Sequence, residues 1–202
     1  MKRIVLASSN PGKLAEFNQL FAEVGLEVVA QASLGVADAD ETGLSFVENA
    51  LLKARNAAAA TGLPALADDS GICVDHLRGA PGLYSARYSG GHGDNAANNA
   101  RLLRELDGVP EEQRGAFFIC VLALVRHAED PAPLIAEGRW HGRVLDAPRG
   151  PGGFGYDPLF LPDGLSHSAA ELEPASKNRL SHRGQALAML HARLAGWQRD
   201  RT

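Results

Sequence analysis

Two stretches of the chain hold residues of types that bind phosphate and metal. The first, Ser8-Ser9-Asn10-Pro11-Gly12-Lys13, lies between a predicted strand and a predicted helix. Backbone N–H groups at a helix start attract anions, and a lysine in the first turn adds a positive charge. The stretch is not a Walker A loop, because Leu14 follows Lys13 where serine or threonine is required. It predicts either a phosphate site or a plain helix cap by Asn10, with Lys13 solvated.

The second stretch is acidic and suits a divalent cation. Asp68-Asp69-Ser70-Gly71 follows apolar residues at a predicted strand end, and Glu41 precedes a predicted helix. Carboxylates from separate loops suit Mg²⁺, which takes one or two of them and completes its shell with waters and phosphate oxygens. Adjacent strand residues point to opposite faces, so we expect at most one of Asp68 and Asp69 to enter a given pocket. The alternative is a hydrated acidic surface.

Two further stretches suit recognition of a nucleotide. Gly152-Gly153-Phe154-Gly155-Tyr156-Asp157-Pro158 is a loop that can approach a flat ligand, so that a base stacks on Phe154 or Tyr156. The alternative places both rings in the hydrophobic core. Lys177-Asn178-Arg179-Leu180-Ser181-His182-Arg183-Gly184 gathers three cations and a histidine around a predicted helix start, which suits an anion or a base edge. The alternative there is a solvated basic face.

The elements that position these stretches alternate between strand and helix patterns. Apolar runs predict strands at residues 2–7, 27–30, 63–77, 116–125 and 134–145, the third sharply interrupted by the acidic stretch. Caps predict helices that begin at Asn10, Ser45, Asp94 and Ser181, and glycines end the first three at Gly25, Gly62 and Gly108. Gly138 and Gly142 are candidate β-bulges. Strand–helix–strand order with long central strands favours an α/β fold with a mixed sheet.

Length and composition exclude several classes of protein. The chain has 202 residues, 45% hydrophobic and 22% charged, which is typical of a globular protein and predicts one domain over residues 1–202. Its net charge of −4 argues against a general binder of nucleic acid or anionic membrane. Cys73 and Cys120 lie in apolar runs and are interpreted as reduced core thiols. The first apolar run is too short for a signal peptide, so we expect a soluble, cytoplasmic protein.

Six motifs occur in order along the chain and together resemble one family. They are Ser8-Ser9-Asn10-x-x-Lys13, Glu41-Thr42-Gly43-x-Ser45-Phe46-x-Glu48-Asn49-Ala50, Ala67-Asp68-Asp69-Ser70-Gly71, Pro81-Gly82-x-Tyr84-Ser85-Ala86-Arg87-Tyr88, Phe154-Gly155-Tyr156-Asp157-Pro158 and Ser181-His182-Arg183. With these motifs the chain resembles, over essentially its whole length, the Ham1-like inosine triphosphate pyrophosphatase family.

The resemblance implies a fold, an activity and partners. The fold is an elongated mixed α/β sheet flanked by helices, with two lobes and a central cleft, and the protein is a homodimer. The activity is Mg²⁺-dependent hydrolysis of ITP, dITP and XTP to the monophosphate and pyrophosphate, which removes deaminated purines from the nucleotide pool. The partner is therefore a small-molecule nucleotide, and neither a nucleic acid polymer nor a membrane.

The resemblance also implies roles for individual residues. The triphosphate is held by Ser8, Ser9, Asn10, Pro11, Gly12 and Lys13. The metal is held by Glu41 and Asp69, with Asp68 as a further candidate. Asp69 is the general base, and the roles of Asp68 and Asp69 are open to exchange; Lys13 and Glu41 complete the catalytic set. Ser70 contacts the substrate, and the nucleotide pocket is formed by Phe154, Gly155, Tyr156, Asp157, Lys177, His182 and Arg183.

Three other functions are alternatives. A Maf-like pyrophosphatase acting on modified nucleotides is disfavoured by the Phe-Gly-Tyr-Asp and Ser-His-Arg motifs. A nucleotide-binding protein without catalysis is disfavoured because Lys13, Glu41 and Asp69 are all present. An RNA-binding accessory domain is disfavoured by the net acidity of the chain and the absence of a broad basic segment.

Overall fold

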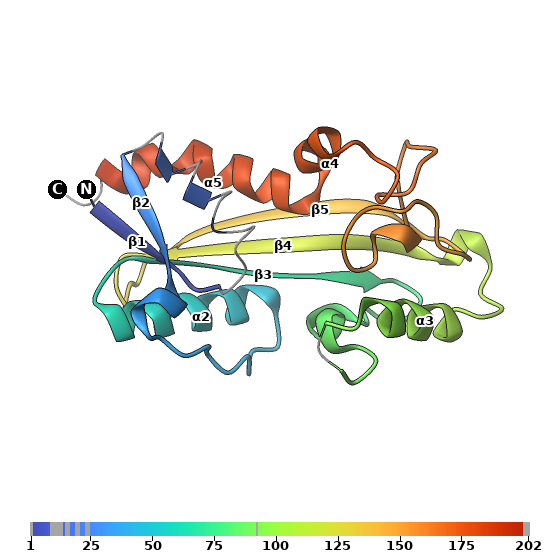
Figure 1. The fold of residues 1–202 in the computed structure, drawn as a ribbon, viewed down its shortest axis with the longest axis horizontal. Helices are drawn as coiled ribbons and strands as arrows, with labels where there is room; N and C mark the ends of the chain where they lie inside the picture. The colour runs from blue at the N-terminus through green and yellow to red at the C-terminus, as the bar shows by residue number, and fades with distance from the viewer. Residues whose placement is uncertain are drawn as a thin grey trace. The chain divides into compact units, whose positions relative to one another are not determined.

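The strands of the chain form one six-stranded sheet in the computed structural model, which describes residues 2–8, 14, 17–18, 21–22, 25–91 and 93–199. Within these residues the sheet has the order β2-β1-β3-β4-β5-β6 (Figure 1). Its strands are β1 (Lys2–Leu6), β2 (Leu26–Ala30), β3 (Ala65–Val74), β4 (Gly115–Val125), β5 (Leu134–Val144) and β6 (Phe160–Pro162).

The sheet is mixed, as the sequence predicted. β1 pairs in parallel with β2 on one side and with β3 on the other, whereas β5 and β6 are antiparallel. Ile4, Val5 and Leu6 of β1 are completely buried. Such continuous burial is expected of a parallel strand that is covered on both faces, because its crossover connections lie over the sheet. The mixed α/β class is therefore confirmed, while the central cleft and the single domain stay predictions.

The chain divides into two compact units, each built from separate segments of the sequence. The first unit contains residues 1–69, 121–137 and 186–202, and the second contains residues 70–120 and 138–185. β3 runs without a break from one unit into the other, so Asp69 of the first unit and Ser70 of the second are consecutive strand residues.

In the first unit the helix α2 (Phe46–Thr61) begins and ends where the sequence predicted. Ser45 Oγ accepts a hydrogen bond from Glu48 N at 3.3 Å, and the Glu48 carboxylate accepts one from Leu44 N at 3.0 Å. These bonds satisfy N–H groups that have no partner within the helix. Gly62 ends the helix with a φ of 66°, a conformation that glycine adopts without steric cost. Buried alanines allow α2 to pack closely against β1.

In the second unit the helices are α3 (Asn95–Glu105), α4 (Pro174–Leu180) and the start of α5 (His182–Arg199). Asp94 Oδ1 accepts from Ala97 N at 2.9 Å and Ser181 Oγ accepts from Gly184 N at 3.2 Å, which confirms both predicted caps. The prediction that Gly108 ends α3 was wrong, because the helix ends three residues earlier and a turn follows. The helix α4 was not predicted.

The predicted interruption of the third strand at the acidic stretch was wrong. Asp68, Asp69, Ser70 and Gly71 all lie inside β3 and continue its extended backbone. Their intrinsic strand propensity is low. β3 lies between β1 and β4, however, and a strand with neighbours on both sides has ladder partners that outweigh local propensity. The acidic side chains are therefore held by a strand and not by a loop.

One predicted bulge is a point of close approach. Gly142 pairs with Pro162 in the antiparallel ladder of β5 and β6, and a Cβ at this position would collide with Leu161 O. Glycine is required because β6 passes too close for any side chain. Gly138 lies inside β5, and the strand continues through it without a break.

The segment that follows β3 in the second unit is anchored to α3 by polar contacts. The Tyr88 hydroxyl donates to the Glu105 carboxylate, and the Arg101 guanidinium lies over the Tyr88 ring at 4.2 Å. Asn98 Oδ1 accepts from Ser89 N at 2.7 Å. Burial raises the pKa of the Tyr88 phenol to about 12, and the hydrogen bond to Glu105 adds to this shift.

We predict that Tyr88 makes the stability of the protein fall at alkaline pH. An unfolded chain releases the phenolic proton near pH 10, whereas the folded protein retains it until about pH 12. Between these values the unfolded state binds fewer protons, so the contribution of Tyr88 to stability is complete below pH 10 and is lost as the pH rises. In urea unfolding, the stability difference between wild type and Tyr88→Phe should shrink through this window. A constant difference would contradict the prediction, and Tyr84→Phe is the exposed control.

Candidate functional site

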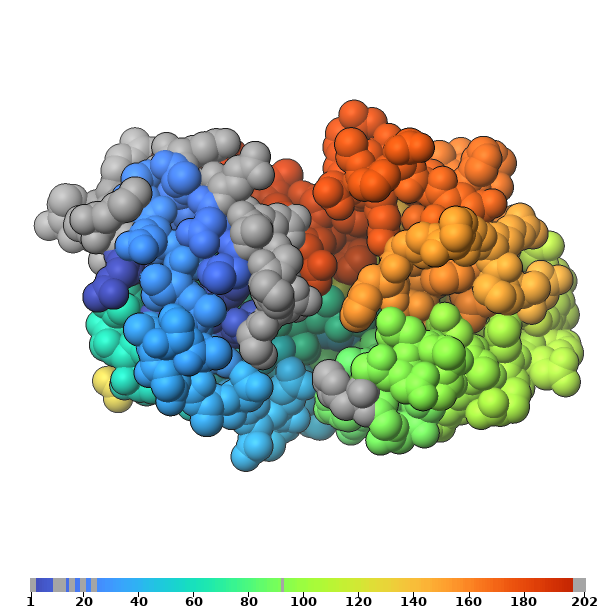
Figure 2. Space-filling view, viewed as in Figure 1, coloured from blue at the N-terminus to red at the C-terminus, as the bar shows by residue number. Residues whose placement is uncertain are grey.

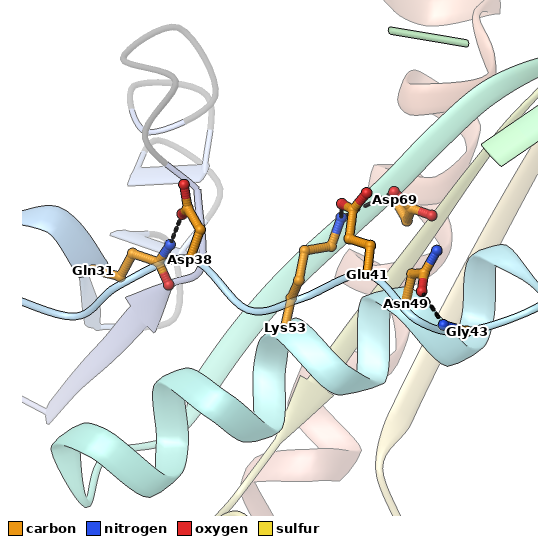
Figure 3. Close-up of polar contacts among 7 residues, drawn as sticks. All are labelled: Gln31, Asp38, Glu41, Gly43, Asn49, Lys53 and Asp69. Atoms are coloured by element: carbon orange, nitrogen blue, oxygen red, sulfur yellow. Dashed lines mark hydrogen bonds and ion pairs between the residues drawn. The ribbon is translucent and has the colours of Figure 1, made fainter. Parts of the chain in front are cut away.

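Glu41, Lys53 and Asp69 form a cluster of charges in the first unit (Figure 3). Lys53 Nζ lies 2.8 Å from Glu41 Oε1 and 2.9 Å from Asp69 Oδ1, within hydrogen-bond distance of both. Lys53 comes from α2, Glu41 from the loop before that helix, and Asp69 from β3. Three elements thus converge on one ammonium group, and the cluster carries a formal charge of −1.

The loop that carries Glu41 is pinned to α2 by Asn49. Asn49 is 1% exposed, and its Oδ1 accepts a hydrogen bond from Gly43 N at 2.8 Å (Figure 3). A Cβ at Gly43 would lie 2.6 Å from Glu48 Cβ and 2.7 Å from Asn49 Oδ1, so only glycine allows this approach. Asn49 and Lys53 are four residues apart and lie on the same side of the helix. One face of α2 therefore fixes the loop and supplies the central cation.

Burial and charge have opposite effects on the pKa values of Lys53 and Asp69. Burial pushes the pKa of Lys53 down, but the charges and hydrogen bonds of Asp69 and Glu41 outweigh it and raise the pKa above its ordinary value. Burial also raises the pKa of Asp69, and the ion pair with Lys53 offsets only part of this effect. Lys53 is accordingly held as a cation, and Asp69 is a stronger proton acceptor than an exposed aspartate.

The donor chemistry of this cluster fits a magnesium ion. Glu41 and Asp69 direct carboxylate oxygens at a single positive charge and are both partly exposed. Among the residues that the structure describes, no group of three or more His, Cys, Asp or Glu side chains forms a complete metal cage. Mg²⁺ does not need one, because it usually binds one or two carboxylates and completes its octahedral shell with waters and substrate phosphates.

Asp68 and Asp69 differ in their surroundings. Asp69 contacts Lys53, whereas Asp68 is buried, and successive strand residues point to opposite faces. Ser8 is half-buried just after β1. The rest of the predicted phosphate loop, Ser9, Asn10, Pro11, Gly12 and Lys13, lies outside the described residues.

The second unit contains a cavity of about 210 Å³. Eight residues that the sequence predicted to bind substrate line it, namely Ser70, Phe154, Gly155, Tyr156, Asp157, Lys177, His182 and Arg183. They come from β3, the glycine-rich loop, α4 and α5, which are far apart in the sequence. Ile72, Ser85, Asn95 and Phe118 also line the cavity, and the sequence analysis assigned none of them a role in the site.

The two aromatic residues of the glycine-rich loop differ in burial. Tyr156 is 4% exposed, and its hydroxyl donates to Ser85 O at 2.8 Å, which anchors the loop to the segment before α3. Phe154 is 76% exposed at the edge of the cavity. Figure 2 shows orange surface beside green surface in the second unit, and Asn99 Nδ2 donates to Gly155 O at 3.1 Å. Phe154 therefore presents a ring that can stack on a base.

Asp157 links the glycine-rich loop to α4. Its buried carboxylate accepts hydrogen bonds from Phe154 N and from Lys177 Nζ. Gly153 has a φ of 84°, and a Cβ there would lie 2.6 Å from Asp157 Cβ. The carboxylate thus fixes both the backbone of Phe154 and the position of the Lys177 ammonium. In the structure Asp157 holds two other residues of the cavity in place.

A tight corner between α4 and α5 brings the last predicted residues to the cavity. Ser181 separates the two helices, and His182 and Arg183 are the first residues of α5. A Cβ at Gly184 would collide with Asn178 O, so this corner requires glycine. His182 stacks on Phe118 of β4, with ring centroids 4.9 Å apart and an angle of 11° between the ring planes.

The sequence analysis missed Lys53, Ser85 and Phe118. Lys53 follows Asn49 by one helical turn, so the motif that contains Asn49 was a usable signal for it. Ser85 lies inside a quoted motif, where it accepts from Ile72 N at 3.0 Å and donates to Gly82 O at 2.6 Å. Phe118 had no signal, because it lies in an apolar run in which every residue is a core candidate.

The fold and these two groups of residues define a member of a known class of α/β proteins. The family model of the Ham1 family matches residues 4–193, and the chain belongs to that family. A solved HAM1 protein from Coxiella burnetii superposes with a TM-score of 0.93 at 47% identity, over 97% of this chain and 100% of that one. A second structure, of a nucleoside-triphosphatase / dITP/XTP pyrophosphatase from Mycobacterium abscessus, has a TM-score of 0.81 at 49% identity, over 93% and 98%.

Two curated relatives are both named dITP/XTP pyrophosphatase. The dITP/XTP pyrophosphatase of Ralstonia nicotianae is 62% identical over 197 residues, which cover 96% of this chain and 97% of the relative. The dITP/XTP pyrophosphatase of Thioalkalivibrio sulfidiphilus is 58% identical over 194 residues, which cover 96% and 99%. Among the described residues, no helix is both long and apolar enough to cross a membrane.

We predict that Lys53→Met destabilises the protein and that Mg²⁺ partly reverses this loss. The substitution leaves Glu41 and Asp69 without the cation between them, at a cost of about 1.5–3 kcal/mol in the free energy of unfolding. Urea unfolding with and without Mg²⁺ measures both effects. Arg55→Met, an exposed position on the same helix, is the matched control. Equal stability of Lys53→Met and wild type would refute the central role of the ammonium.

Proposed function

We propose that the protein hydrolyses deaminated purine nucleoside triphosphates, namely ITP, dITP and XTP, to the monophosphate and pyrophosphate, and so clears them from the nucleotide pool. The observation that carries this proposal is the convergence of eight predicted nucleotide-binding residues on one cavity. The names of two relatives at about 60% identity, both dITP/XTP pyrophosphatases, support it.

Each unit is assigned one part of the substrate. The base belongs in the cavity, where Phe154 offers a stacking surface and His182 and Arg183 offer hydrogen-bond donors. The triphosphate belongs with the Glu41–Lys53–Asp69 cluster and with the loop Ser8–Lys13.

Charge is the main obstacle to the reaction. Two unit charges 4 Å apart interact with roughly 4 kcal/mol at an effective dielectric constant near 20, so hydroxide is strongly repelled by a triphosphate. Lys53 is fixed by two carboxylates, which preorganises its positive charge before substrate arrives. Lys13 adds a further cation. These side chains stabilise the charge that develops on the phosphates as pyrophosphate leaves.

Glu41 and Asp69 are the residues that would hold Mg²⁺, with Asp68 as the further candidate. When bound, the ion neutralises phosphate charge and increases the acidity of water. Asp69 orients the attacking water and accepts its proton. Lys53 holds the Asp69 carboxylate in place through Oδ1. Attack is assigned to the α-phosphorus, which releases pyrophosphate as the leaving group and keeps the attacked phosphorus in the monophosphate.

Recognition of the 6-oxo group explains rejection of ATP. A 6-oxo purine offers an acceptor where adenine offers an amino donor. A donor from His182 or Arg183 is therefore paired with the oxygen of a 6-oxo purine. Opposite the amino group of adenine the same donor has no partner, which costs about 1–3 kcal/mol. The resemblance to the family further suggests that the protein is cytoplasmic and forms a homodimer. Light scattering on the purified protein tests whether it is a dimer.

We expect a panel of nucleotides with Mg²⁺ to show pyrophosphate release from ITP, dITP and XTP at rates well above that from ATP. In ¹⁸O-labelled water the label should enter the monophosphate, because the attacked phosphorus remains with the nucleoside. Label found only in pyrophosphate would exclude attack at the α-phosphorus. Equal rates on all purine triphosphates would exclude the proposed selectivity.

Removal of the metal is expected to abolish activity, and added Mg²⁺ should restore it. Glu41→Gln keeps the shape of the side chain but removes its charge. Activity of this variant should therefore require at least about tenfold more Mg²⁺ for half-maximal rate, as is typical when the surroundings of a metal are altered. Full activity in excess chelator, or an unchanged Mg²⁺ requirement in Glu41→Gln, would contradict the proposed role of the metal.

A further inference from the structure

We propose that Phe118 is a positioning residue, which fixes the plane of the His182 imidazole and thereby contributes to selection of 6-oxo over 6-amino purines. This inference rests on the proposed function, because it concerns the residue assigned to the edge of the base. It adds a residue that no motif in the sequence indicated.

The two rings form a parallel stack on the wall of the cavity. Their centroids are 4.9 Å apart and their planes differ by 11°. Both residues line the same cavity of about 210 Å³, together with Phe154, Lys177 and Arg183. Phe118 is 7% exposed and His182 is half-buried. One face of the imidazole is therefore covered by Phe118, which leaves ring rotation no space on that side.

Phe118 is itself held by the aromatic core of the second unit. Its ring packs edge-on against Phe160, with centroids 4.7 Å apart and an angle of 69°. Phe160 is completely buried and packs in turn against Trp140, at 5.4 Å and 60°. Edge-to-face pairs at these distances are favourable, and close-packed cores resist displacement. The orientation of His182 is thus set by buried rings.

A fixed plane matters because imidazole hydrogen bonds are directional. The ring N–H lies in the plane of the imidazole, and a hydrogen bond weakens steeply when its angle falls below about 120°. The backbone of His182 is fixed by the glycine-dependent corner between α4 and α5. Stacking fixes the remaining freedom, which is rotation of the ring. A ring free to rotate can turn its donor away from the 6-position and so accept either purine.

Phe117, the next residue of β4, provides a matched control. It makes its own contact with a histidine, His141, at 5.5 Å and 36°, but it is not among the residues that line the cavity. Phe117→Leu and Phe118→Leu therefore remove the same atoms from adjacent positions of one strand. Only the second removes the stack on His182.

The test compares the kcat/KM ratio of ITP to ATP in wild type, Phe118→Leu, Phe118→Tyr and Phe117→Leu. We expect the ratio to fall roughly two- to tenfold in Phe118→Leu, which is the range given by a lost aromatic pair. It should be unchanged in Phe118→Tyr, which keeps the ring, and in Phe117→Leu. The inhibition constant of tripolyphosphate, which has no base, should be unchanged in all four proteins. An unchanged ratio in folded Phe118→Leu would overturn the inference.

NMR of the histidine ring protons supplies a readout that does not depend on activity. The resonances of His182, identified by their loss in His182→Gln, should be shifted upfield in wild type and Phe118→Tyr by the ring current of residue 118. Unshifted resonances in wild type would overturn the inference even if Phe118→Leu did not fold. Failure of wild type to release pyrophosphate from ITP would instead refute the proposed function, and the upfield shift would still report the stack.

Discussion

The ammonium of Lys53, held between two carboxylates, is the interaction on which the charged cluster of the first unit depends. Glu41 and Asp69 would repel each other if they approached without a cation. With Lys53 at 2.8 Å and 2.9 Å, the loop, the helix and the strand that carry the three residues are drawn together. The result is an oxygen-rich, preorganised site in a protein of net negative charge, which suits a divalent cation and the phosphates that accompany it.

The cavity of the second unit is built on a different principle. Its walls are held by hydrogen bonds to the backbone and by buried rings. Tyr156 binds Ser85 O, and the Asp157 carboxylate binds Phe154 N and Lys177. The exposed ring of Phe154 and the side chains of His182 and Arg183 line the same cavity. The charged cluster of the first unit and the cavity of the second unit are therefore held by separate sets of contacts.

Local sequence patterns predicted the helix caps correctly. Ser45, Asp94 and Ser181 were predicted as caps, and each accepts the expected backbone hydrogen bond. The acidic stretch was predicted to interrupt a strand and does not, because its low propensity is outweighed by partners on both sides of β3. The short helix α4 was missed, since it begins at a proline and has only seven residues, too few for a clear apolar period.

The sequence by itself determined the inventory of chemistry and the family of the fold. The motifs named the acidic, basic and glycine-rich stretches, and the periodic apolar runs placed them on an α/β framework. Only the tertiary structure decided that Lys53 is the partner of Glu41 and Asp69, 12 and 16 residues away, and that Tyr156 is buried against Ser85, 71 residues away. The physical reason is range: caps and periodicity act over a few residues, whereas these contacts form only when the chain has packed.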